Sequence, residues 1–83
     1  IARTYGYQIF QGERLASRDK LIALSVAMHL TLPECNRLLT IAKAGILYSK
    51  NRRDAILIFG IERGLSFIDI NELLYEMGED VLE

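Results

Sequence analysis

The feature that most constrains the fold is an internal repeat. Residues 18–39 read RDKLIALSVAMHLTLPECNRLL, and residues 53–74 read RDAILIFGIERGLSFIDINELL, at a constant offset of 35 residues. The identical pairs are Arg18/Arg53, Asp19/Asp54, Leu30/Leu65, Asn36/Asn71, Leu38/Leu73 and Leu39/Leu74. Each copy reads as a helix, a short turn and a second helix. Because two copies are too few for a solenoid, the repeat predicts two helical hairpins packed on each other in one small bundle.

Size and composition limit the class of protein. Eighty-three residues make one domain at most, and a hydrophobic fraction of 51% argues against disorder. There is no uninterrupted apolar run of about 20 residues, so we expect no membrane span, and we also expect no signal peptide. The single Cys35 has no partner for an internal disulfide, which favours a cytoplasmic location. Because the chain begins with Ile1 rather than Met, we expect it to be a fragment or a processed product.

The small net charge of −1 hides a strong asymmetry along the chain. Residues 1–53 carry a formal charge of +6, and residues 54–83 carry −7. A basic half is suited to a polyanion, while an acidic half keeps the rest of the chain in solution. The alternative interpretation is that both halves carry ordinary solvated charges that pair in the fold. The charges alone leave these two interpretations about equally supported.

Helix signals predict an all-α fold with about five helices. The expected helices cover residues 2–11, 18–29, a segment from Thr31 to Gly45, residues 52–62, and a segment from Ser66 to Gly78. Thr31 and Ser66 are N-cap candidates, each with an acidic residue three positions later. Residues 79–83 are expected to be a frayed acidic tail. The expected buried stripes are Leu21, Leu24 and Met28, widened by Ile22 and Val26; Cys35, Leu38, Leu39 and Ala42; and Phe67, Ile70, Leu74 and Met77.

The helix expected over residues 52–62 contains a segment, AILIFGI, that is apolar on every side. By itself this segment is also compatible with a buried strand, but the repeat aligns it with the amphipathic helix at 18–29. A helix that is apolar all round is either central in the fold or part of an interface. A homodimer through Ile58 and Phe59 is therefore a possible partner arrangement.

Catalytic and metal chemistry find little support. His29 and Cys35 are the only residues of their types, and no CxxC or HExxH pattern is present. His29 lies near a helix end, where a structural role is the ordinary one. Cys35 lies on an apolar face, where a thiol behaves as a small hydrophobe. We therefore expect no enzyme activity, no catalytic residue, no metal site and no cofactor.

DNA binding has more support in the first residues. We expect Arg3, Thr4 and Gln8 to project from one side of a short helix, and Arg and Gln are side chains that read base edges in the major groove. The phosphate-contact candidates follow directly, and they are Arg14, Arg18 and Lys20. An ordinary amphipathic end-helix is the alternative interpretation of the same residues.

Residues 2–45 resemble the second half of a Cro/repressor-type (lambda-repressor-like, XRE) helix-turn-helix domain. Ile9 matches the family's buried aliphatic position, and Gly12-Glu13-Arg14 matches its turn after the recognition helix. The resemblance implies that double-stranded DNA is the partner. It implies contacts from Arg3, Thr4 and Gln8, with Tyr7 and Gln11 beside them.

The chain also departs from that family pattern. The family's first two helices have no counterpart, and Gly6 and Phe10 stand where an aliphatic and a polar residue are usual. We therefore expect a partial helix-turn-helix region at 1–45 and an additional helical hairpin at 46–83, in one compact domain. The rival hypothesis is a protein-interaction module that docks a partner through the apolar 52–62 helix or through Tyr5 and Tyr7, without DNA binding.

Overall fold

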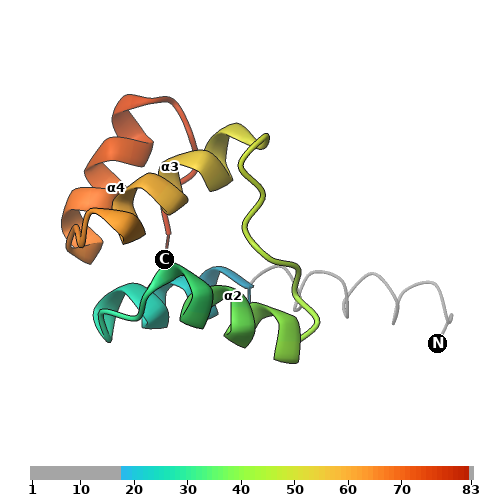
Figure 1. The fold of residues 1–83 in the computed structure, drawn as a ribbon. Coiled ribbons are helices and arrows are strands. Elements are labelled where there is room, and N and C mark those ends of the chain that lie inside the picture. Colours follow the sequence, from blue (N-terminus) through green and yellow to red (C-terminus); the bar gives the residue numbers. More distant parts are fainter. Residues whose placement is uncertain (1–17, 83) are drawn as a thin grey trace, which may run out of the picture.

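The computed structural model describes residues 18–82, and these residues form a bundle of helices (Figure 1). Residues 18–27 are helical, followed by α2 (Leu32–Ile41), α3 (Arg52–Glu62) and α4 (Phe67–Glu76), with no strand in this range. The prediction of an all-α fold is confirmed. These four helices are one fewer than the five expected, and the remaining one, at residues 2–11, lies outside the described residues.

Local side-chain caps start the helices where the sequence predicts. The Thr31 hydroxyl accepts the Glu34 N–H, and the Glu34 carboxylate accepts the Thr31 N–H, which completes a capping box before α2. Ser66 accepts the Asp69 N–H in the same way before α4. These side chains satisfy amide groups that have no partner within the helix, so both predicted N-caps are confirmed.

The helices of the two repeats also end in the same way. Residues in the left-handed region follow the helices at equivalent positions: His29 (φ 54°) matches Gly64 (φ 67°), and Lys43 (φ 56°) matches Gly78 (φ 75°). The prediction that Gly45 ends the third expected helix is wrong, because α2 ends at Ile41 and Lys43 makes the turn that glycine usually makes.

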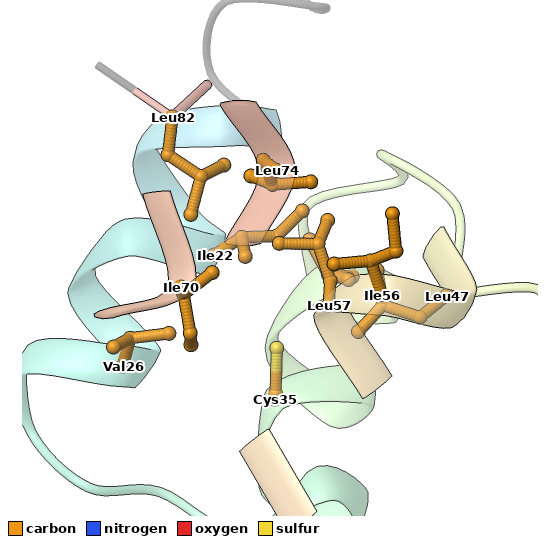
Figure 2. Close-up of a cluster of buried hydrophobic side chains, with 10 residues drawn as sticks. Ile22, Val26, Cys35, Leu47, Ile56, Leu57, Ile70, Leu74 and Leu82 are labelled. Atoms are coloured by element: carbon orange, nitrogen blue, oxygen red, sulfur yellow. The ribbon is translucent and has the colours of Figure 1, made fainter. Parts of the chain in front are cut away.

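One hydrophobic core joins the two hairpins (Figure 2). Its buried members are Ile22, Val26, Cys35, Leu39, Leu47, Ile56, Leu57, Ile70, Leu74 and Leu82. Several of them occupy equivalent repeat positions, for example Ile22 with Leu57 and Leu39 with Leu74. Burying an aliphatic side chain of this size contributes about 1.5–3 kcal/mol, so this shared core stabilises the packing of the two hairpins on each other.

The buried face of the first helix differs from the predicted stripe. Leu24 and Met28 are 48% and 59% exposed, whereas Ile22, Ser25 and Val26 face the core. The hydrophobic spacing allowed either face, and packing against the second hairpin selected the one with Ile22 and Val26. Ala42 and Met77, also expected in the core, are exposed because each lies at the C-cap of its helix.

The prediction of a frayed C-terminal tail is wrong. Leu82 is only 2% exposed and completes the core. The Asn71 side chain holds it, because Oδ1 accepts the Leu82 N–H at 2.7 Å and Nδ2 donates to the Leu82 carbonyl at 2.9 Å. The first repeat does the same, since Asn36 Oδ1 accepts the Leu47 N–H at 3.0 Å. The sequence signal for this hydrogen bond was the recurrence of Asn36 as Asn71, with a leucine eleven residues after each.

Candidate functional site

Most of the predicted DNA-contact residues cannot be placed. Six of them lie outside the described residues, and they are Arg3, Thr4, Tyr7, Gln8, Gln11 and Arg14. Arg18 and Lys20 lie in the 18–27 helix, where the described part of the chain begins.

Arg18 is committed to contacts inside the protein. Its guanidinium forms a bidentate pair with the Asp54 carboxylate, with Nη1–Oδ1 at 3.3 Å and Nη2–Oδ2 at 3.0 Å. Nε donates to the Gly45 carbonyl and Nη2 to the Ile46 carbonyl, at 3.1 and 2.9 Å. The Arg18 side chain is 17% exposed and that of Asp54 is 9%. A guanidinium carries five N–H donors, and these contacts use most of them, so they account for Arg18 without a phosphate.

A matching ion pair joins Arg53 of the second repeat to Asp19 of the first. Arg53 Nη1 and Nη2 each donate to the Asp19 carboxylate at 3.0 Å, and Nε donates to the Asp80 carbonyl at 2.9 Å. The hydrogen bond from Asp19 raises the pKa of Arg53 above its ordinary value, although burial acts in the opposite direction. The arginine of each Arg-Asp dipeptide thus pairs with the aspartate of the other dipeptide. The sequence signal for these pairs was the repeated Arg-Asp itself.

Lys20 belongs to a set of exposed cations on the first half of the described chain. Arg37 on α2 is exposed as well, and so are Lys43 and Lys50 in the connector between α2 and α3, residues 42–51. Within residues 18–82 the ion pairs are Arg18–Asp54, Arg53–Asp19 and a looser Arg52–Glu79 contact, so these four cations take part in none. The exposed acids Asp69, Glu72, Glu76 and Asp80 are on α4 and the segment after it. The charge asymmetry of the sequence is therefore kept on the folded surface.

The residues expected to form a dimer contact are partly covered. Ile58 is half-buried against the core, and Phe59 is 44% exposed. The Arg63 guanidinium lies over the Phe59 ring, 4.6 Å from its centroid. Beside this ring a shallow groove of about 360 Å³ runs between α3 and α4, lined by Arg52, Ala55, Ile56, Phe59, Leu73 and Met77.

The other sequence candidates show no reactive arrangement in residues 18–82. Cys35 is a free and fully buried thiol, and His29 is exposed at the end of the first helix. No group of three or more His, Cys, Asp or Glu side chains in this range is placed to hold a metal ion. Within the same range, no helix has the length and apolar character to cross a membrane.

Comparisons with family models, with curated proteins and with solved structures gave no match to this chain. The fold and the surface therefore define the protein only as a small all-α domain made of two similar hairpins, each tied to the other by an Arg–Asp pair. Any assignment of function must rest on the residues themselves.

Proposed function

We propose that this chain is part of a sequence-specific DNA-binding transcriptional regulator of the helix-turn-helix kind. In this proposal residues 3–11 form the recognition helix in the major groove, and residues 18–82 are the rigid body that carries it. The protein acts on double-stranded DNA in the cytoplasm and is not an enzyme.

The observation that supports the proposal is a set of exposed cations, on the first hairpin and the segment after it, that take part in no ion pair within residues 18–82. Lys20 is exposed in the first turn of the described body, and Arg37, Lys43 and Lys50 are exposed on the same hairpin and its connector. Neutralising phosphates with such cations releases condensed counterions from the duplex, which is the main source of affinity for DNA. The exposed acids Glu72 and Glu76 lie on α4, in the other hairpin.

The contacts of Arg18 support dividing the predicted phosphate contacts by role. Arg14 and Lys20 contact phosphates. Arg18 has an internal role, because its guanidinium ties the 18–27 helix to Asp54 and to the carbonyls of Gly45 and Ile46. Base reading stays with Arg3, Thr4 and Gln8, with Tyr7 and Gln11 beside them.

The test is selection of duplexes from a random pool by the full-length gene product, followed by titration of the selected sequence at several salt concentrations. We expect Gln8→Ala and Arg3→Ala to relax the base preference at single positions by about 1–3 kcal/mol each. Lys20→Ala is expected to weaken binding to all sequences and to reduce the slope of log K against log salt by about one.

Glu62→Ala is the matched control, since Glu62 is an exposed charge on α3 away from the proposed DNA surface. If no sequence is enriched, or if the Arg3 and Gln8 variants bind the selected duplex as well as the parent, the assignment is wrong.

A second candidate is a protein-interaction module, favoured by the apolar groove beside Phe59. Ala55, Ile56, Leu73 and Met77 line that groove, so a hydrophobic side chain of a partner or of a second copy has a surface to bury. In this case Phe59→Asp abolishes association while Lys20→Ala leaves it unchanged. The DNA proposal predicts the reverse pattern for duplex binding.

A further inference from the structure

We propose that copies of this chain associate head-to-tail, with the outer face of α4 in one copy packed against the outer face of α2 in the next. The α4 face consists of Ile68, Asn71, Glu72, Tyr75, Glu76 and Val81. The α2 face consists of the residues at the equivalent repeat positions, which are Pro33, Asn36, Arg37, Thr40, Ile41 and Ile46. This contact is separate from the groove beside Phe59, and its α2 face shares Arg37 with the basic surface proposed to contact DNA.

The α4 face is an apolar groove with an acidic edge. It has a volume of about 520 Å³ and runs along α4 beside the C-terminal segment. Ile68 and Tyr75 are 69% and 78% exposed, which is unusual for two large side chains on one side of a helix. Glu72 and Glu76 stand beside them and are exposed, and neither takes part in an ion pair within residues 18–82. An occupant of this groove must therefore combine apolar and basic side chains.

The α2 face combines exposed basic side chains with exposed apolar ones. Where α4 carries Glu72, α2 carries the exposed Arg37. Where α4 carries Glu76, α2 carries Ile41, which is 71% exposed. Lys43 adds a second exposed cation just past the end of the helix. The one acid on this helix, Glu34, is in its first turn, where it closes the capping box with Thr31.

A second copy is the occupant that these two faces define. The two repeats share the same succession of helix, turn and helix, and the exchange of Glu72 for Arg37 at one equivalent position gives the two faces opposite charges there. Within one molecule the two faces do not meet, because α2 and α4 lie apart in the bundle (Figure 1) and each helix turns other residues to the shared core, Cys35 and Leu39 from α2 and Ile70 and Leu74 from α4. The basic and apolar side chains that the α4 face requires are therefore supplied by α2 of another copy.

The arrangement determines the kind of assembly. Two different faces on opposite sides of a molecule form a heterologous contact, which two copies cannot satisfy completely. Each added copy offers a new free face, so the assembly grows into short chains or closes into a ring. The average mass should therefore increase with protein concentration beyond that of a dimer.

The experiment is sedimentation velocity of the full chain over a range of concentrations at low and high salt, combined with exchange of equivalent charges. We expect Glu72→Arg and Arg37→Glu, each alone, to weaken association about tenfold or more, because an attractive pair across the contact becomes repulsive. Mixing these two variants should restore association. The Glu72→Arg variant then has two basic faces and the Arg37→Glu variant two acidic ones, so each face finds an oppositely charged face on the other variant. The double variant Arg37→Glu with Glu72→Arg should associate with itself again.

Two controls separate this contact from other causes. Glu62→Arg makes the same change of charge on an exposed part of α3 and should leave association intact. Circular dichroism of every variant checks the fold, which exposed substitutions should preserve. The proposal is overturned by a single monomeric species up to millimolar concentration, by an assembly that stops at a dimer, or by association that Phe59→Asp removes and the charge exchange does not.

Discussion

Replacing Asp54 with alanine should destabilise the protein far more than the same change at Asp19, although the two residues occupy equivalent positions in the repeat. Asp54 is 6% exposed and accepts three hydrogen bonds. Two come from Arg18, and the third comes from the Tyr48 backbone N–H at 3.0 Å. Asp19 accepts from Arg53 alone within residues 18–82, and its side chain is 30% exposed.

The magnitudes follow from burial. Removing one member of a buried ion pair costs about 3–5 kcal/mol, because the partner charge stays buried without its counterion. Arg18 keeps two carbonyl acceptors, which reduces the loss, whereas the Tyr48 N–H loses its partner, which adds to it. We therefore expect Asp54→Ala to lower the free energy of unfolding by about 3 kcal/mol. For the more exposed Asp19–Arg53 pair, solvent screening reduces the expected loss to about 1 kcal/mol.

Urea denaturation followed by far-ultraviolet circular dichroism measures both losses. A double-mutant cycle with Arg18→Ala isolates the Arg18–Asp54 interaction itself, and a cycle with Arg53→Ala isolates its counterpart. The coupling energy should be larger for Arg18–Asp54. Equal losses for Asp54→Ala and Asp19→Ala, within about 0.5 kcal/mol, would refute the argument from burial.

Two further predictions use the repeat as its own control. A Cβ atom on Gly60 would lie 2.6 Å from Ile70 Cγ1, so Gly60→Ser should cost about 1–3 kcal/mol, measured by urea denaturation. Adding Ile70→Cys should recover part of that loss, because the equivalent positions of the first repeat are Ser25 and Cys35 and both are buried. Losses of the two single variants that simply add in the double variant would contradict this. Lys43 has a φ of 56° where the second repeat has Gly78, so Lys43→Gly should raise the free energy of unfolding by about 0.5–1 kcal/mol. The reverse change, Gly78→Lys, should lower it, and the same sign for both variants in thermal denaturation would show that left-handed strain is not the cause.

Much of the local structure could be predicted because its causes lie close together in the sequence. Thr31 and Ser66 begin helices through bonds to residues three positions away, and the repeat offset distinguished helix from strand for the apolar segment in α3. The candidate site was predictable only in part. Lys20 is exposed as a phosphate contact requires, whereas the sequence did not show that Arg18 is held by Asp54.

The amino-acid sequence by itself determined that residues 18–82 are all-α, that they form two similar hairpins, and where α2, α3 and α4 begin. The tertiary structure decided which side of each helix is buried, how Leu82 joins the core, and which carboxylate each arginine meets. The physical reason is distance along the chain. A cap depends on a few adjacent residues, whereas Arg18 and Asp54 are 36 positions apart and meet only when the two hairpins have packed.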